Sequence, residues 1–388
     1  MSLPEIAPLD VVPDASSDLA VIFSGGGARA AYQVGLLKGL ARHFPDLRFD
    51  ILLGASAGGM NAVYLAALQG ALAEKAEHLA EMWCDLTCDS IYHFDLKALL
   101  PFRFGPQSQP HGMVDTTPLR NFLCRVLNVA PGQAIPGIEE NIRTGDLRAL
   151  ALLALDYSTG QTVRWVQGGH YDDYDGPNRR VVMTRFTIDH ILASSALPFV
   201  FPAVQIGDSW YGDGSIRLAA PLSPAVHLGA KRILVMSTTY QRTAAEASIP
   251  DFTGYPPASA ILGQLLNAIF IDVIEDDAAR MHRMNELLRK LAPHERDGLT
   301  PIDLLVLRPS ISLSKLAGEY RRDLPRKLQL LVRMLGAREN ESPDFVSLLM
   351  FEPEYTKRII ELGEADVATR LPEVRAFLGE ETRLVAAG

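Results

Sequence analysis

The sequence predicts an α/β protein built in three layers, with a mostly parallel sheet between two layers of helices. Residues 19–23 and 51–53 are continuously apolar, each run ends in a turn that contains glycine, and each is followed by a helical pattern. Strands buried on both faces have this composition, and two strand–turn–helix units in succession imply parallel strands. Hydrophobic residues make up 48% and charged residues 21% of the 388 positions, which supplies a large core.

The remaining elements follow in order along the chain. Apolar runs predict further strands at residues 149–155, 162–166, 210–211, 233–237 and 302–307. Helices fill much of the space between them, and from about Ser312 onward the pattern is wholly helical. We therefore expect three parts: a flexible leader at residues 1–18, a main α/β domain at 19–310 and a helical C-terminal extension at 311–388.

Composition excludes several classes of protein. The formal net charge is −9, so a nucleic-acid backbone would repel the chain on average and no nucleic-acid partner is expected. The three cysteines, Cys84, Cys88 and Cys124, suit a reducing compartment and are interpreted as small buried hydrophobic residues, so no metal site is expected. The first residues predict no secretory signal, and no apolar run reaches the ~20 residues that cross a bilayer. We expect a cytoplasmic protein, and the sequence leaves its oligomeric state open.

The strongest local motif is Gly54-Ala55-Ser56-Ala57-Gly58, which lies where a predicted strand turns into a helix. In that context a serine occupies a strained turn with its hydroxyl exposed, and small neighbours let the backbone turn that sharply. Ser56 is therefore the candidate nucleophile. The alternative is an ordinary turn, because five small residues recur by chance in many chains.

A second motif, Ser24-Gly25-Gly26-Gly27-Ala28-Arg29, also joins a strand to a helix. A glycine run there frees backbone N–H groups to bind an anion, either a phosphate or the oxyanion of an acyl-transfer intermediate. As a dinucleotide fingerprint the run fits loosely, whereas an oxyanion hole belongs with the serine elbow that follows. Arg29 is expected to steady this loop or to meet an anionic headgroup; a helix-surface arginine is the alternative.

A serine nucleophile needs a base, and the nine histidines do not supply an obvious one. The late histidines, His227, His282 and His294, lie in predicted helices and are interpreted as solvated. Asp213 instead stands between two glycines in Gly212-Asp213-Gly214, where a carboxylate is either a base or only a turn former.

Taken together, these motifs resemble the patatin-like phospholipase family. Gly25 to Arg29 is similar to its oxyanion-hole element, Gly54 to Gly58 to its nucleophile elbow, and Asp213-Gly214 to its Asp-Gly element. The stretches Asp115 to Leu119 and Ala193 to Pro202 also resemble family segments, so the likeness covers about residues 19 to 240.

This resemblance implies a catalytic domain at residues 19–310 and a Ser56–Asp213 dyad without histidine. It implies an oxyanion-hole element made of Gly25, Gly26, Gly27 and Arg29. It also implies hydrolysis of phospholipid or other lipid esters by a phospholipase A or lysophospholipase activity without a cofactor. Two alternatives stay open: a lipid-binding regulator with an inactive dyad, and a nucleotide-binding oxidoreductase that uses the triple glycine.

Contact with lipid would need apolar side chains near the site. Phe199 and Phe201 are candidates for an acyl channel, although apolar residues between prolines more often pack in the core. Phe102 and Phe104 flank Arg103, a pattern that suits the periphery of a membrane, with core packing as the alternative.

Overall fold

The computed structural model describes residues 18–94, 114–171, 175–198, 200–217, 220–248, 255, 261, 263–265, 272–326, 328–329 and 343–379. Residues 1–17 of the expected leader, Phe199, and the segment with Phe102 and Phe104 lie outside the described residues.

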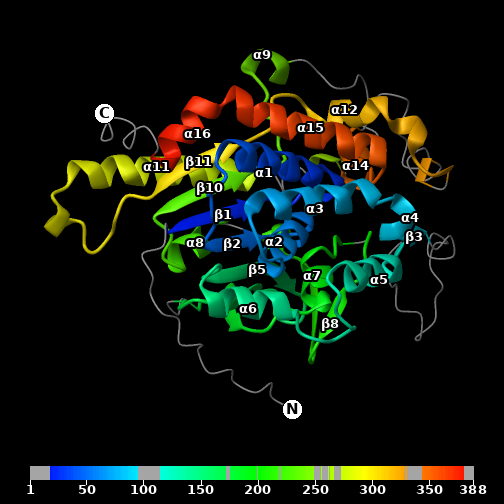
Figure 1. Ribbon diagram of the computed structural model, residues 1–388, viewed down its shortest axis with the longest axis horizontal. Helices are drawn as coiled ribbons and strands as arrows, with labels where there is room; N and C mark the ends of the chain where they lie inside the picture. Colours follow the sequence, from blue (N-terminus) through cyan, green and yellow to red (C-terminus); the bar gives the residue numbers. More distant parts are fainter. Residues whose placement is uncertain are drawn as a thin grey trace.

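One mixed sheet runs through the middle of the molecule, in the strand order β11-β10-β1-β2-β5-β6-β7 (Figure 1). Its strands are β1 (Leu19–Phe23), β2 (Ile51–Gly54), β5 (Ala149–Asp156), β6 (Thr162–Gly168), β7 (Arg179–Met183), β10 (Arg232–Met236) and β11 (Asp303–Leu307). The first five strands in spatial order are parallel, and β6 runs antiparallel to β5. Two further strands, β8 (Val204–Ile206) and β9 (Ser209–Asp213), form a hairpin that pairs with the end of β5. The predicted mostly parallel sheet is confirmed.

Helices cover both faces of this sheet, because alternate residues of each strand face opposite layers. In β1, Leu19, Val21 and Phe23 belong to one hydrophobic cluster, with side chains of α1 (Ala31–His43), α2 (Ala57–Ala67), α3 (Leu72–Asp85) and α15 (Pro353–Thr369). Ala20 and Ile22 belong to a second cluster, with side chains next to and within α8 (Ser223–His227) and α11 (Asp272–Lys290). The three-layer arrangement follows from these two clusters.

Shorter elements complete the described fold. They are the helices η1 (Gly27–Ala30), α4 (Cys88–Ile91), α5 (Thr117–Val126), α6 (Pro136–Thr144), α7 (Ile188–Ser194), η2 (Gly214–Arg217), α9 (Ala244–Ala247), η3 (Pro293–Glu295), α12 (Leu313–Glu319), η4 (Arg321–Asp323), α14 (Pro343–Leu349) and α16 (Leu371–Leu378), and the small sheet of β3 (His93–Phe94) and β4 (Val114–Asp115). Among the described residues no helix is both long enough and apolar enough to cross a membrane.

The C-terminal helix α15 lies directly along α1, as Figure 1 shows in red-orange and dark blue. The two backbones approach closely, since a Cβ atom added to Gly35 would lie 2.0 Å from the carbonyl oxygen of Ile360. The buried Tyr32 hydroxyl also donates to Asp366 Oδ2 at 2.8 Å. Helices from residues 343–379 thus share one hydrophobic cluster with the N-terminal strands and helices.

Substitution of Gly35 by alanine tests this close approach. We expect Gly35→Ala to lower the free energy of unfolding by about 2–3 kcal/mol, because the added methyl group meets backbone that cannot rotate away. The control is Gly318→Ala in α12, where an added Cβ meets nothing within 4 Å; it should leave stability unchanged or raise it slightly. Urea denaturation measures both, and equal stabilities would contradict the tight α1–α15 contact.

Candidate functional site

Ser56 stands on a sharp turn between β2 and α2. Its backbone has φ 55° and ψ −136°, a conformation that residues other than glycine seldom adopt and that costs roughly 1–3 kcal/mol. Two hydrogen bonds hold the turn, since the Ser56 amide donates to the carbonyl of Ser194 at 3.1 Å and to its hydroxyl at 3.2 Å. Ser194 is itself fixed by donating to the Leu153 carbonyl at 2.7 Å. The turn places the Ser56 hydroxyl at a pocket and at the N-terminus of α2.

The triple-glycine turn leaves β1 beside this elbow. Gly26 has φ 151° and Gly27 has φ 55°, values that glycine adopts readily and residues with a side chain seldom adopt. Space also requires glycine: a Cβ atom on Gly26 would lie 2.4 Å from Thr238 Oγ1, and one on Gly27 would lie 2.1 Å from the Leu348 carbonyl oxygen. Among the described residues the amides of Gly25 and Gly26 donate no hydrogen bond. Unpaired amides in a glycine turn are the donors that an anion-binding loop uses.

Asp213 ends β9 and is completely buried. Its Oδ1 accepts the Ser215 amide at 2.9 Å, whereas Oδ2 has no hydrogen-bond partner among the described residues. Burial raises the pKa of Asp213 to about 6, and the approaching Ser56 hydroxyl and the Ser215 amide partly offset this by favouring the carboxylate. The side chain is therefore a stronger base than an ordinary aspartate, with one oxygen free to take a proton.

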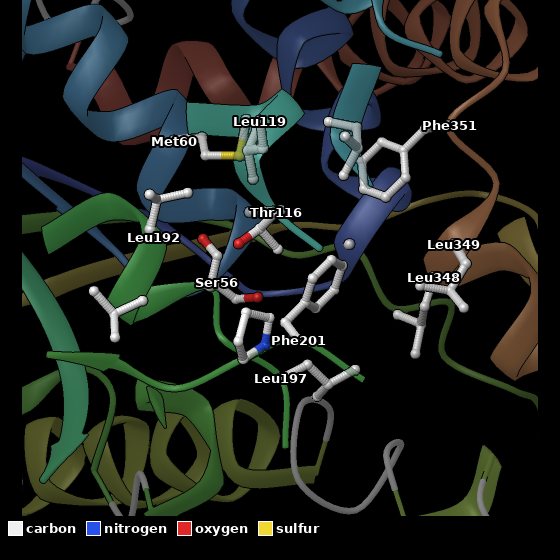
Figure 2. Close-up of a pocket in the computed structure, with 16 residues that line it drawn as sticks. Ser56, Met60, Thr116, Leu119, Leu192, Leu197, Phe201, Leu348, Leu349 and Phe351 are labelled. Atoms are coloured by element: carbon white, nitrogen blue, oxygen red, sulfur yellow. The ribbon is translucent and has the colours of Figure 1, made fainter. Parts of the chain in front are cut away.

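Ser56 lines an apolar pocket (Figure 2). The lining residues are Gly27, Ser56, Ala57, Met60, Ile91, Thr116, Leu119, Leu192, Ser195, Leu197, Phe201, Pro202, Val204, Leu348, Leu349 and Phe351. Most of them are hydrocarbon side chains, and no described lining residue is charged or a histidine. The apolar lining suits a hydrocarbon group, and the Ser56 hydroxyl is one of its few polar groups.

The structure brings some predicted residues together and separates others. Ser56, Gly27 and Phe201 line the same pocket, and the Asp213 carboxyl at the end of β9 lies close enough to the Ser56 hydroxyl for that hydroxyl to lower its pKa. Gly25 instead lines a second, smaller cavity, together with Ser215. His227, the late histidine nearest Asp213 in the chain, stacks on Tyr171 in another part of the fold.

Arg29 is 4% exposed and does not lie on the helix surface. Its Nε donates to Ser347 Oγ at 2.7 Å, and its Nη2 donates to the carbonyl and side chain of Asp344 at 2.9 and 3.1 Å. The guanidinium of Arg29 thus joins the helix that follows the glycine turn to α14.

Sequence reasoning missed the C-terminal wall of the pocket. Leu348, Leu349 and Phe351 belong to a helical pattern without any local sign of a site. Thr116 and Leu119 could have been found, because they lie in the segment Asp115 to Leu119 that resembles a family motif. Ser194 lies in the similar stretch from Ala193, but its hydrogen bonds to the elbow depend on tertiary contact.

The fold and this site define an α/β protein with an apolar pocket at the carboxyl edge of its parallel strands. The model of the patatin-like phospholipase family matches residues 21–226, a range that includes the triple glycine, Ser56 and Asp213 and covers just over half of the chain. The chain belongs to the patatin-like phospholipase family, and this membership supports lipid hydrolase activity.

Solved structures with a similar fold include VipD from Legionella pneumophila, with 11% identity and a TM-score of 0.33 over 95% of this chain and 70% of that one. Human GIVD cytosolic phospholipase A2 gives 12% identity and a TM-score of 0.45 over 93% of this chain and 59% of that one. A structure of the same human protein in complex with methyl gamma-linolenyl fluorophosphonate gives 13% identity and a TM-score of 0.43, with coverage of 95% and 60%. The chain thus spans about three fifths of the human protein. A comparison with curated proteins gave no match.

The burial of Asp213 can be tested through stability. Its pKa is about 6 in the folded chain against 3.8 for an ordinary aspartate, so between these values the folded state binds more protons than the unfolded state and loses stability as the pH rises. Asparagine does not titrate. We therefore expect the unfolding free energy of wild type to fall by about 2–3 kcal/mol from pH 4 to pH 8 relative to that of Asp213→Asn.

Urea denaturation at both pH values measures this difference. The control is Asp146→Asn, which changes an exposed carboxylate paired with Arg48 and should show no such gain. The same stability difference from wild type at pH 4 and pH 8 for Asp213→Asn would argue against a raised pKa.

Proposed function

We propose that this chain hydrolyses carboxylic esters of phospholipids or other lipids, as a phospholipase A or lysophospholipase, with Ser56 and Asp213 as a catalytic dyad. One observation carries the proposal: Ser56 lines an apolar pocket and lies close to a buried carboxylate, one oxygen of which has no hydrogen-bond partner among the described residues. The pocket offers a place for an acyl chain, and the dyad offers the chemistry to cleave its ester bond.

In the proposed reaction the Ser56 hydroxyl attacks the ester carbonyl carbon while its proton passes to Asp213. The tetrahedral oxyanion is stabilised by the amides of Gly26 and Gly27 and by the N-terminus of α2. The leaving alcohol takes the proton from Asp213 and departs, which leaves an acyl-serine. Water then attacks this acyl group and loses a proton to Asp213. The Ser56 oxygen leaves, takes that proton back from Asp213, and the fatty acid is released.

A pKa of about 6 suits Asp213 to act as a general base near neutral pH, as the proposed reaction requires. At neutral pH Asp213 is ionised in most molecules, so its carboxylate can accept a proton. It is nonetheless a better base than a solvated aspartate, because its pKa lies nearer to the operating pH. Burial of the carboxylate is therefore part of the proposed mechanism.

The apolar surroundings favour this function over the alternative uses of the same loop. A pyrophosphate at the triple glycine would face Leu348 and the hydrocarbon lining of the pocket, which offers no charged partner among the described lining residues. An inactive lipid-binding regulator would not need a free carboxylate oxygen beside the serine. We place the proposed activity in the cytoplasm, at the periphery of lipid membranes.

Removal of the nucleophile tests the proposal. We expect Ser56→Ala to lower kcat/KM for a lipid ester at least about 1,000-fold, and to lose labelling by a fluorophosphonate probe that reacts with an activated serine. The control, Ser158→Ala, changes an exposed serine in the turn after β5 and should behave as wild type. Peptide mapping that found the probe on another residue would contradict the assignment.

The pH dependence gives an independent check on the base. Because Asp213 must be ionised to accept the serine proton, kcat/KM should rise with pH and level off above an apparent pKa of about 6. Esterase assays across pH 4–9 measure the profile. A rate that stays level from pH 4 to pH 7 would exclude Asp213 as the base.

A further inference from the structure

One wall of the pocket comes from the far end of the chain. Leu348 and Leu349 end α14, and Phe351 follows in the next turn. Figure 2 shows these three side chains across the pocket from Leu192, with Ser56 between the two sides. They lie more than 100 residues beyond the part of the chain that matches the family model, within the segment 311–388 expected as an extension.

This wall is attached to the glycine turn by a buried network. Arg29, two residues after Gly27, bonds to Ser347 and to both the carbonyl and side chain of Asp344, and the Ser314 hydroxyl donates to the same carboxylate. The Leu348 carbonyl oxygen lies so close to Gly27 that an added Cβ would overlap it. The loop that supplies the proposed oxyanion amides and the wall of the pocket therefore form one packed unit.

A second set of contacts fixes the other side of the wall. The Leu349 carbonyl accepts the Tyr92 hydroxyl at 2.9 Å and the Cys88 thiol at 3.4 Å. Phe351 stacks on Trp83, with ring centroids 6.1 Å apart and planes inclined by 15°. With buried partners on both sides, the wall keeps a definite position and shape.

We propose that the segment Asp344 to Phe351 sets the acyl-chain selectivity of the pocket, with Arg29 as a positioning residue that holds this segment against the glycine turn. The proposal rests on the proposed function, since it takes the pocket to bind the acyl chain. Leu348, Leu349 and Phe351 determine selectivity because a longer acyl chain contacts more of the apolar surface that they supply. Arg29 acts through Asp344 and Ser347 and does not bind a lipid headgroup.

The experiment compares two probes that differ in chain length. Methyl butyl and methyl dodecyl fluorophosphonate would be reacted with the full chain, and the rate of Ser56 labelling would be measured for each. We expect Phe351→Ala and Leu348→Ala each to lower the dodecyl-to-butyl ratio of rates about tenfold, since the loss of even one methylene contact in an apolar pocket is worth that much. A rise of similar size would mean that the wall limits chain length, and would equally place selectivity in this segment.

The matched control is Leu313→Ala, which truncates a buried leucine on α12, the helix that packs on α14, outside the pocket lining. Because partial unfolding slows both probes together, the control should leave the ratio within twofold of wild type. If Phe351→Ala and Leu348→Ala leave it there as well, the selectivity proposal is wrong. If wild type is not labelled at Ser56 by either probe, the proposed function itself fails.

A further variant tests the role of Arg29 through its partner. Asp344→Asn keeps the size of the side chain but removes the charge that faces the buried guanidinium, so the wall should shift and the ratio should change several-fold from wild type. Glu140→Gln is the control, because it removes the same charge from the exposed Arg143–Glu140 pair. A purely structural role for the Arg29–Asp344 pair would slow both probes equally, and an unchanged ratio would overturn the assignment.

Discussion

The site depends on one strained turn, the left-handed backbone at Ser56. A residue with a side chain adopts this conformation only where its surroundings enforce it, and here the enforcement comes from Ser194, whose carbonyl and hydroxyl both accept the Ser56 amide. Ser194 also bonds to Leu153 in the central strand β5. The strained backbone is thus held by contacts to the sheet, and the turn cannot relax without disturbing the core.

Burial of Asp213 adds an electrostatic cost to the conformational strain at Ser56. Removing a carboxylate from water disfavours its charged form. Burial therefore destabilises the folded chain when Asp213 is ionised, and it also raises the pKa of the carboxyl to about 6. The hairpin β8–β9 makes this possible, because it pairs with the end of β5 and brings a residue from far downstream to the elbow. Stability and proposed reactivity are therefore opposed at this residue.

The C-terminal helices change what counts as the site. Their sequence reads as an appendage of amphipathic helices, yet α15 packs on α1 at Gly35 and α14 contacts the glycine turn at Gly27. Such contacts join residues more than 300 positions apart. The helical pattern of each segment predicts a helix but not the segment on which that helix packs. The sequence thus indicated where helices form but not that one of them closes the pocket.

The sequence by itself determined the features that are local in the chain: the parallel strands from their apolar runs, the elbow at Ser56 and the glycine turn before Arg29. Each depends on the conformational preferences of a few adjacent residues, and these preferences can be recognised in a short stretch of sequence. Only the tertiary structure decided which partner each group meets, such as Asp344 for Arg29, 315 positions away. It also decided that the Asp213 carboxylate loses its water, because burial is a property of packing among distant segments and not of a residue's neighbours in sequence.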